Sequence, residues 1–429
     1  MDHLPFIRAI AERDDSDPGP HLIYADFLDE CDDPRGELIR VQLALESMPG
    51  TDPAFAALKR REGGLIQACL PKWIGELKHL GGGIELHRGL PEAITMEAKI
   101  FIARGSEAFD LAPIRHVRFL DIGNRLPALL AHPAARSLRA MTIFAQYLGE
   151  RIGTAFLGAP DLPRLRSLYL GRNNLGDSGV EVLSRCGSLA GLRWLDIGEN
   201  RVGDLGLSAL SRANFSNLGG IESFDNLSTL DGLETILRSG SLSMLEYVGM
   251  SRNRSMESRP SPVGESQSQP RDRDGRSTVA RVLDLRENQI GPSVAETMAA
   301  REVFSCVRSV DFGYNALQDE GIGRLCASSW LPGIRQLTLT DNRIGDDGLI
   351  ELAAHPRPLA LETLDLARGS ISDAGTRAIL HSRCLGELRR IRLPVASLSE
   401  RMFRLFREQY PVLAENGWFC RTTTEEPTR

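Results

Sequence analysis

A period of 27 residues constrains the fold of this chain more than any other feature of its sequence. The stretch LRSLYLGRNNLGDSG, which begins at residue 165, recurs as LRWLDIGENRVGDLG at 192, ARVLDLRENQIGPSV at 280, VRSVDFGYNALQDEG at 307, IRQLTLTDNRIGDDG at 334 and LETLDLARGSISDAG at 361. Weaker copies begin at residues 138, 218, 245 and 388, and successive copies are 27, 27, 26, 27, 35, 27, 27, 27 and 27 residues apart. Such regularity predicts a solenoid, because one unit cannot bury its apolar face alone and must stack on its neighbours.

Each copy follows the template LxxLxLxxNxL, then a GDxG-like step and an apolar-periodic stretch such as VEVLSRC. In RSLYL the leucines alternate with outward residues, as in a half-buried strand. The template resembles the leucine-rich repeat, in the longer ribonuclease-inhibitor-like type in which a strand alternates with a helix. The resemblance implies an α/β solenoid of horseshoe form, with a parallel sheet on the concave face and helices on the convex face.

Two polar positions of the repeat are interpreted as structural. The asparagine at the ninth position sits where the chain leaves the strand, and its side chain can bond free backbone groups of the turns. It occurs as Asn173, Asn200, Asn226, Asn253, Asn288, Asn315 and Asn342. The aspartate at the thirteenth position is predicted to be a helix N-cap. It occurs as Asp177, Asp204, Asp319, Asp346 and Asp373.

The N-terminal region differs from the repeats and contains three helix-like blocks, PFIRAIAER, HLIYADFLDE and RGELIRVQLALES. The run YADFLDE followed by DDPRGELIRVQ resembles the repeat-companion segment at the N-terminus of many bacterial repeat proteins, notably in planctomycetes. We expect Arg35 and Arg40 to pair with carboxylates of the preceding helix and so to fix a helical hairpin. An acidic docking surface is the alternative interpretation of the same polar residues.

These observations divide the chain into five parts. We expect a helical repeat-companion domain at 1–48, a helical linker at 49–80, an N-terminal cap with a degenerate first repeat at 81–137, the leucine-rich-repeat solenoid at 138–415 and a C-terminal tail at 416–429. Within the solenoid, the polar insertion 254–277 is predicted to be a disordered loop on the convex side. A tolerated surface insertion and a regulatory or docking tether are both open for it.

Composition excludes several classes of protein. No run approaches the roughly 20 apolar residues of a membrane span, and the N-terminus lacks the basic start and apolar stretch of a signal peptide, so we expect a cytoplasmic protein without membrane contact. Seven scattered cysteines without a CxxC spacing predict reduced thiols. Of the net charge of −6, residues 1–50 hold twelve acidic residues against four arginines. The remainder is nearly neutral, which argues against nucleic-acid binding.

The sequence shows no pattern of catalytic type. It has no GxxxxGK[ST] loop, no HExxH, no GxSxG and no dinucleotide-binding fingerprint. The eight histidines fall at unrelated positions of the repeat, so none is assigned as a metal ligand. We therefore expect no catalytic residue, no cofactor and no metal.

The outward positions of the strands form columns across successive repeats, and these columns hold the candidate binding residues. Carboxylates dominate the fifth position, and tyrosine and tryptophan, which anchor protein interfaces, lie among them. The candidate partner-binding residues of the concave face are Tyr169, Arg172, Trp194, Asp196, Glu222, Tyr247, Asp284, Asp311, Tyr314 and Asp365. The second position is basic in most repeats, so a charge ladder that separates like charges on adjacent strands is an alternative explanation of the acidic column.

The function predicted from these features is a non-catalytic scaffold. It would bind an unidentified protein of basic or mixed charge on the concave face, and we expect it to be a monomer. The alternative is a regulator that activates a small GTPase, since some eukaryotic proteins with similar repeats do so and an exposed arginine or asparagine can stabilise phosphoryl-transfer charge. No residue of the columns stands out for that role.

Overall fold

The computed structural model of the chain describes residues 2–13, 17–50, 52–253, 256, 280–394, 397–414 and 418–420. The predicted insertion 254–277 lies outside the described residues except for Met256, which is buried. The chain divides into two compact units. The first comprises Met1–Asn173 and Cys186–Leu192, and the second comprises Asn174–Arg185 and Arg193–Arg429.

The first unit begins with four helices: α1 (Leu4–Glu12), α2 (Gly19–Glu30), α3 (Arg35–Ser47) and α4 (Phe55–Trp73), followed by the short 3-10 helix η1 (Glu76–His79). The three helix-like blocks of the sequence fold as α1, α2 and α3. Their apolar side chains share one core, in which Ile10, Tyr24, Leu28 and Ile39 pack with Leu90 of the first sheet. Burial of this cluster joins the N-terminal helices to the sheet.

One of the two predicted arginine contacts in this region is correct and the other is wrong. Arg40 pairs with Asp26 and Asp29 of α2, both at 2.5 Å, as expected. Arg35 instead pairs at 2.6 Å with Asp33, in the turn that joins α2 to α3. Asp33 also accepts the Arg35 backbone N–H at 3.0 Å. Asp33 in the turn therefore binds the Arg35 side chain in place of a carboxylate of α2.

A sheet follows the N-terminal helices of the first unit. Its strands, in spatial order, are β1 (Gly82–His87), β2 (Leu90–Glu97), β3 (His116–Leu120), β4 (Ala140–Ile143) and β5 (Ser167–Tyr169). β1 and β2 are antiparallel, whereas β2 to β5 are parallel. The return connections contain α5 (Ala98–Leu111), η2 (Gly123–Arg125), α6 (Leu126–Ala131), η3 (Pro133–Ser137), α7 (Arg151–Leu157) and η4 (Gly187–Leu189).

The second unit repeats a short strand and a helix. Its parallel strands, in spatial order, are β6 (Trp194–Asp196), β7 (Gly220–Glu222), β8 (Tyr247–Gly249), β9 (Val282–Asp284), β10 (Ser309–Asp311), β11 (Gln336–Thr338), β12 (Thr363–Asp365) and β13 (Arg390–Arg392). The antiparallel strands β15 (Trp418–Cys420) and β14 (Val412–Ala414) complete this sheet. β15 thus lies within residues 416–429, which we expected to be a C-terminal tail.

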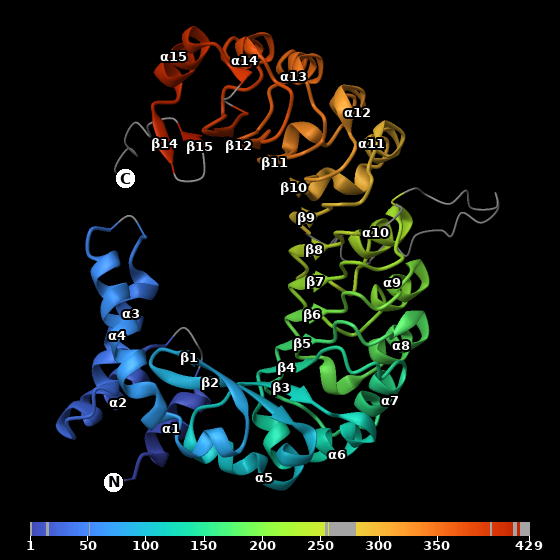
Figure 1. Cartoon of the computed structure of the whole chain (residues 1–429). Coiled ribbons are helices and arrows are strands. Elements are labelled where there is room, and N and C mark those ends of the chain that lie inside the picture. Colours follow the sequence, from blue (N-terminus) through green and yellow to red (C-terminus); the bar gives the residue numbers. More distant parts are fainter. Residues whose placement is uncertain are drawn as a thin grey trace. The chain divides into compact units, whose positions relative to one another are not determined.

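Helices pack behind the strands of the second unit. They are α8 (Gly176–Ser184), α9 (Asp204–Leu210), α10 (Leu230–Leu237), α11 (Pro292–Ala299), η5 (Glu302–Cys306), α12 (Gln318–Cys326), η6 (Leu331–Gly333), α13 (Asp346–Ala353), α14 (Asp373–Leu380) and α15 (Glu400–Gln409). Figure 1 shows the strands β6 to β12 along one side of this unit and the helices along the other. The middle residue of each strand is buried toward the helices, so the residues before and after it point to the opposite face.

Between β8 and β9 the described part of the chain contains no helix, and an arginine after α11 contacts α10. Arg301, which follows α11, pairs with Asp231 at 2.7 Å and with Glu234 at 2.5 Å, both on α10. It also donates to the Leu230 carbonyl at 3.3 Å. These contacts link α10 to the segment that follows α11.

The ninth-position asparagines are buried and bond the backbone of adjacent repeats, as predicted. Asn200 donates from Nδ2 to the Ile197 and Gly198 carbonyls, at 2.9 and 2.8 Å, and its Oδ1 accepts the Leu175 N–H at 3.2 Å. All seven are at most 8% exposed. One side chain therefore satisfies several buried backbone groups, which would otherwise destabilise the stack.

The prediction that the thirteenth-position aspartates cap their own helices is wrong. Asp177 lies inside α8, and its Oδ1 accepts the N–H groups of Gly203 and Gly206, at 2.7 and 2.9 Å, at the start of α9. Asp346 likewise accepts the N–H groups of Ser372 and Gly375, at 2.8 and 3.0 Å, at the start of α14. Each aspartate therefore caps the helix of the following repeat and couples neighbouring repeats.

Candidate functional site

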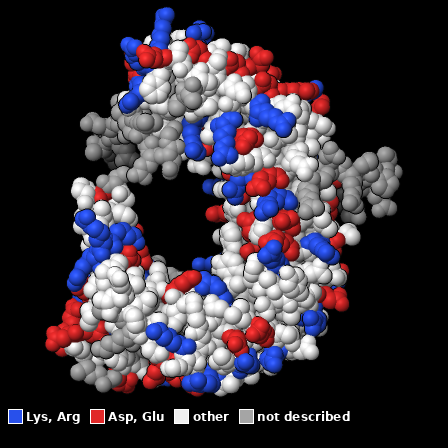
Figure 2. All heavy atoms as spheres, in the orientation of Figure 1, with Lys and Arg blue, Asp and Glu red and all other residues white. Residues whose placement is uncertain are grey.

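The ten candidate binding residues divide between the two units. Tyr169 and Arg172 lie in the first unit, and the other eight lie in the second. Seven of the eight are on strands, and Tyr314 is in the turn after β10. We call the outward side chains of β6 to β12 the strand face of the second unit. Figure 2 shows acidic and basic side chains interspersed along these strands.

The strand register brings the predicted acidic column together. Asp196 is paired with Glu222, Glu222 with Gly249, and Gly249 with Asp284, which is paired in turn with Asp311. Because neighbouring parallel strands lie about 4.8 Å apart, these positions form a continuous row. Asp284 is only 7% exposed, so a partner could contact little of its carboxylate.

Two aromatic rings stack on the strand face across a glycine. The ring centres of Trp194 and Tyr247 are 5.3 Å apart, with an angle of 26° between the ring planes. The residue between them in the register is Gly220, and a Cβ there would lie 2.4 Å from two carbons of the Trp194 ring. The absence of a side chain at Gly220 therefore leaves the space in which the Trp194 ring reaches Tyr247.

Glu222 lies beside this ring pair and is incompletely hydrogen-bonded. Its Oε2 accepts the Tyr247 hydroxyl at 2.9 Å, whereas its buried Oε1 has no hydrogen-bond partner among the described residues. Burial raises the pKa of Glu222 to about 7, and the nearby charges of Asp284 and Asp196 act in the same direction. Burial also raises the pKa of the Tyr247 hydroxyl. Glu222 is therefore a carboxyl group that takes up or releases its proton near neutral pH.

The aspartates of the column hold the turns that follow their strands. Asp196 accepts the Gly198 N–H at 2.8 Å, Asp311 accepts the Gly313 N–H at 2.7 Å, and Asp365 accepts the Ala367 N–H at 2.9 Å. These are bonds to the backbone two residues ahead, a pattern for which aspartate is favoured in turns. Part of the acidic pattern in the sequence therefore has a structural cause.

The cation that compensates the acidic column was missed from the sequence. It is Arg286, whose Nη2 lies 2.6 Å from an Asp284 oxygen and whose Nε lies 3.7 Å from an Asp311 oxygen. Arginines of the second position have other contacts: Arg166 and Arg308 donate to the carbonyls of Pro163 and Ser305, at 3.0 and 2.8 Å. The charge ladder predicted from the sequence assigned this compensation to the second position of the repeat. For Asp284 and Asp311 it comes instead from Arg286, at the seventh position of its repeat.

The eighth-position candidates lie in turns with left-handed backbone. Arg172 and Tyr314 have φ values of 59° and 58°. Tyr314 is 45% exposed, and the Arg368 guanidinium lies 5.7 Å from its ring centre. In the first unit, the Arg172 guanidinium lies 6.0 Å from the ring centre of Phe144. Both candidates therefore take part in cation–π contacts.

Comparison with known proteins identifies the repeat. Residues 163–184, 192–211, 305–326 and 334–353 match the leucine-rich repeat family. The chain folds as a leucine-rich-repeat solenoid. The α/β fold class predicted from the period is thereby confirmed. No curated protein matches the sequence of this chain.

Two solved structures that are similar to this chain have low sequence identity to it. An internalin from Listeria monocytogenes has 18% identity and a TM-score of 0.36, and the match covers 64% of this chain and 71% of that chain. A structure of the Rad7 and Elc1 complex in yeast has 12% identity and a TM-score of 0.39, and the match covers 88% of this chain and 92% of that chain.

The first unit carries exposed apolar residues that were not predicted from the sequence. Leu120 at the end of β3, Phe144 just after β4 and Tyr147 in the next turn are 45%, 44% and 70% exposed. The signal was present in the weak repeat that begins at residue 138, where Gln146 replaces the usual asparagine. Tyr169 also lies in this unit, and its ring stacks on His116 with 5.8 Å between the centres.

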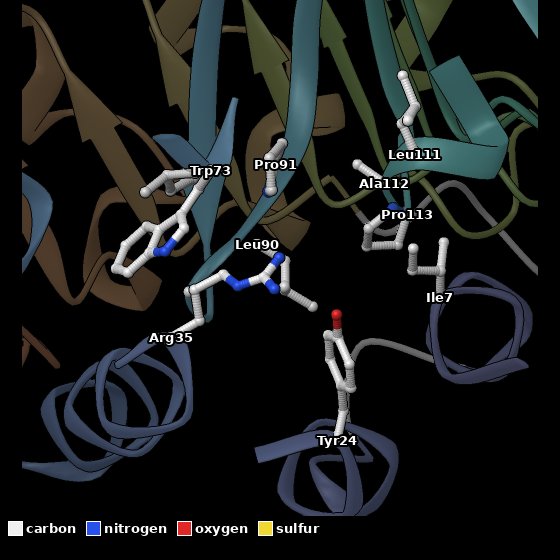
Figure 3. Close-up of a pocket in the computed structure, with 11 residues that line it drawn as sticks. Ile7, Tyr24, Arg35, Trp73, Leu90, Pro91, Leu111, Ala112 and Pro113 are labelled. Atoms are coloured by element: carbon white, nitrogen blue, oxygen red, sulfur yellow. The ribbon is translucent and has the colours of Figure 1, made fainter. Parts of the chain in front are cut away.

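A pocket of about 20 Å³ in the first unit is lined by residues that include Tyr24, Arg35, Trp73 and Leu90. Figure 3 shows the Arg35 guanidinium and the Tyr24 hydroxyl directed into it. That volume holds about one water molecule.

Among the described residues, no group of three or more His, Cys, Asp or Glu side chains could hold a metal ion. None of the helices within the described ranges has the length and apolarity of a membrane span.

Proposed function

We propose that the protein is a non-catalytic interaction scaffold that binds a protein partner on the strand face of its second unit. The observation that carries the proposal is the Trp194–Tyr247 ring pair, which is held on this face beside the carboxyl groups of Asp196 and Glu222. Aromatic side chains that are fixed before binding lose little conformational freedom in a complex, and they are enriched among the residues that dominate binding energy.

The solenoid supports this proposal because it presents side chains at fixed spacing. Buried asparagines and the aspartates that cap the next repeat hold each strand against its neighbour. Strand-face side chains therefore form a preorganised row about 4.8 Å apart from repeat to repeat. A surface of that kind suits recognition of a folded partner, and the aspartates in it are engaged with backbone N–H groups of their turns rather than poised for chemistry.

The candidate residues have different parts in this proposal. Trp194, Tyr247 and Tyr314 supply contact area, and Asp196 and Glu222 supply negative charge beside the ring pair. Asp284 and Asp365, which are 7% and 6% exposed, act mainly by holding Arg286 and the turn after β12. Asp311 shares the Arg286 side chain with Asp284.

The identity of the partner and the cellular setting belong to the same proposal. Carboxylates beside aromatic rings favour a partner of basic or mixed charge that binds a monomer of this chain. The YADFLDE and DDPRGELIRVQ motifs support a bacterial protein whose N-terminal helices are a repeat-companion domain. Cys31, Cys186, Cys306, Cys326 and Cys384 are free thiols, which supports a reducing cytoplasmic location.

Site-specific photo-crosslinking in cells tests this proposal. A benzoylphenylalanine is placed at Val282, which is 38% exposed on β9 and is paired with Tyr247 in the register. The matched control carries the same group at Glu296, which is exposed on α11 of the same repeat. We expect one protein adduct from position 282 and none from position 296. Adducts from position 296 alone, or from neither position, would contradict the proposal.

A further inference from the structure

The negative charge of the strand face is compensated unevenly. Asp284 and Asp311 share Arg286, and Asp365 lies 3.5 Å from a nitrogen of Arg392. Asp196 and Glu222, on β6 and β7, form no ion pair with any residue that the structure describes. The two uncompensated carboxyl groups are adjacent in the register. An incoming positive charge would therefore gain most at this end of the face.

Glu222 also has an unused acceptor. Its Oε2 accepts a hydrogen bond from the Tyr247 hydroxyl, but its buried Oε1 has no partner in the part of the chain that the structure describes. Buried polar atoms in folded proteins nearly always have a partner, and the exceptions call for an explanation. The carboxyl group rests over Gly249, where a Cβ would lie 2.3 Å from Oε2 and 2.4 Å from Oε1. Gly249 thus makes room for the Glu222 carboxyl group, whose Oε1 accepts no hydrogen bond from any residue that the structure describes.

The ring pair beside Glu222 provides the third element. Trp194 and Tyr247 stack nearly parallel, so each ring has one face that the other ring does not cover. Cations bind over the faces of such rings, tryptophan being the strongest. The second unit already contains contacts of this type. The Arg390 guanidinium carbon lies 5.1 Å from the centre of the Trp418 ring, and that of Arg368 lies 5.7 Å from the centre of the Tyr314 ring. A guanidinium group is planar, stacks on aromatic rings and donates to carboxylates in pairs, which an ammonium group does not.

We infer that Trp194, Tyr247, Glu222 and Asp196 form a subsite for an arginine side chain of the partner. The guanidinium lies over the ring pair, with its N–H groups directed toward the two carboxyl groups. This inference rests on the proposed function, since it specifies the chemistry that the strand face recognises. It assigns to Gly220 and Gly249 the role of leaving room for the Trp194 ring and the Glu222 carboxyl group.

Fluorine NMR of the full-length protein labelled with 5-fluorotryptophan tests the subsite directly. The chain has four tryptophans, and the Trp194 resonance is assigned by its loss in Trp194→Phe. The probes are a blocked Gly-Arg-Gly peptide and the same peptide with citrulline, which keeps the shape of arginine without its charge. We expect the arginine peptide to shift the Trp194 resonance saturably, whereas the citrulline peptide leaves it unchanged.

Two variants decide whether the response belongs to the subsite. Glu222→Gln should weaken binding of the arginine peptide about tenfold, the loss expected when one charge-assisted contact is removed. The matched control, Glu287→Gln, alters an exposed glutamate of the second unit that is paired with Arg252, and its affinity should stay within about twofold of the wild type. The resonance of the buried Trp330 reports that each variant remains folded.

Several results would overturn the inference. They are a Trp194 resonance that does not respond to the arginine peptide, an equal response to the citrulline peptide, or an unchanged affinity in Glu222→Gln. These outcomes are distinguishable from failure of the proposed function. A protein adduct at position 282 without an arginine response leaves the strand face as a binding surface and removes only the arginine subsite. Absence of both removes the surface as well.

Discussion

Trp194 and Tyr247 lie two strands apart in the sheet, yet their rings stack with centres 5.3 Å apart. Two strand spacings amount to about 9.6 Å between backbones, so the contact depends on the Trp194 ring extending over the intervening strand. Gly220 is the residue that it covers. The aromatic part of the candidate surface is therefore produced by three residues in successive repeats, and the residue without a side chain is as necessary as the two rings.

Gly220→Ala should disrupt this ring pair. The added Cβ would lie 2.4 Å from the Trp194 ring, so the ring must move away from Tyr247. We expect the free energy of unfolding to fall by about 1 kcal/mol, the usual value of an aromatic pair. Urea denaturation measures the change, and Gly386→Ala is the control because a Cβ there meets no atom within 4 Å. A Gly220→Ala protein as stable as the control would show that the ring pair contributes nothing.

Asn173 and Asn174 are adjacent asparagines, and we expect substitution to lower the free energy of unfolding at Asn173 but not at Asn174. Asn173 is fully buried and donates to the carbonyls of Leu170 and Gly171, at 2.9 and 3.1 Å. Asn174 is exposed, with a φ of 58° that glycine adopts freely. We expect Asn173→Ala to lower the free energy of unfolding by roughly 2–3 kcal/mol, because buried carbonyls lose their donors.

Asn174→Gly is the matched control for that substitution. Its free energy of unfolding should stay within about 0.5 kcal/mol of the wild type, as for most exposed positions. Thermal denaturation of both proteins provides the comparison. Equal losses in the two variants would contradict the structural role assigned to the ninth-position asparagine.

Glu222 should make the stability of the protein depend on pH near neutrality. Its folded-state pKa of about 7 lies above the ordinary value of 4.5, so the folded state binds the proton more tightly than the unfolded state does. The resulting stabilisation is complete below about pH 4.5 and is lost as the pH rises through 7. Since one pKa unit corresponds to 1.36 kcal/mol, the change is at most about 3 kcal/mol.

Glu222→Gln removes this dependence because glutamine does not titrate. The difference in unfolding free energy between wild type and variant should therefore shift in favour of the variant as the pH rises from 5 to 8. Urea denaturation at several pH values measures it. Asp196 and Asp311, whose pKa values are also raised by burial, remain in both proteins and cancel in the comparison. A difference that is constant with pH would refute the assignment.

Glu92 should be essential to the stability of the first unit. Its carboxylate lies 3.1 Å from His87, 3.4 Å from Arg115 and 3.7 Å from His21. Burial alone would raise the pKa of Glu92, but its interactions with these three side chains outweigh burial and lower it to about 2. The carboxylate therefore stabilises the fold above about pH 4.5, and this contribution is lost as the pH falls toward 2.

Glu92→Gln tests this network at neutral pH. It removes the negative charge that lies 3.4 Å from the buried guanidinium of Arg115, and we expect a loss of about 3 kcal/mol. Glu107→Gln is the control in the same unit, since Glu107 forms an exposed pair with Arg104 on α5 and should be nearly neutral. Differential scanning calorimetry compares the two proteins. A melting temperature of Glu92→Gln as high as that of the control would contradict the account.

The period of the sequence was sufficient to predict the strands, the helices and the buried asparagines. It was not sufficient to predict the partner of Asp177, because the spacing within one repeat does not reveal which group of the next repeat lies opposite. The bond from Gly203 to Asp177 spans 26 residues and forms only when two repeats stack at the observed register. A polar residue at a fixed position of a repeat can therefore be structural in a way that only the stack reveals.

The acidic column illustrates the same limit for the candidate site. The sequence shows Asp196 and Glu222 as equivalent members of one column, but the structure separates them. Asp196 holds its turn through Gly198, whereas Glu222 points its carboxyl group over Gly249 and bonds Tyr247. Burial of each carboxyl group is set by neighbouring repeats, so neither the raised pKa of Glu222 nor its unpaired oxygen could be deduced from the spacing of residues.

Affinity purification from the cells that make the protein tests the central claim most directly, because it compares two faces of one folded chain. The wild type is used beside a strand-face variant, Trp194→Ala with Tyr247→Ala, and a helix-face variant, Glu296→Ala with Glu320→Ala, with thermal denaturation as the check on folding. The account predicts that a partner protein is retained by the wild type and by the helix-face variant and is lost from the folded strand-face variant. Retention by the strand-face variant, or loss from the helix-face variant alone, would contradict it.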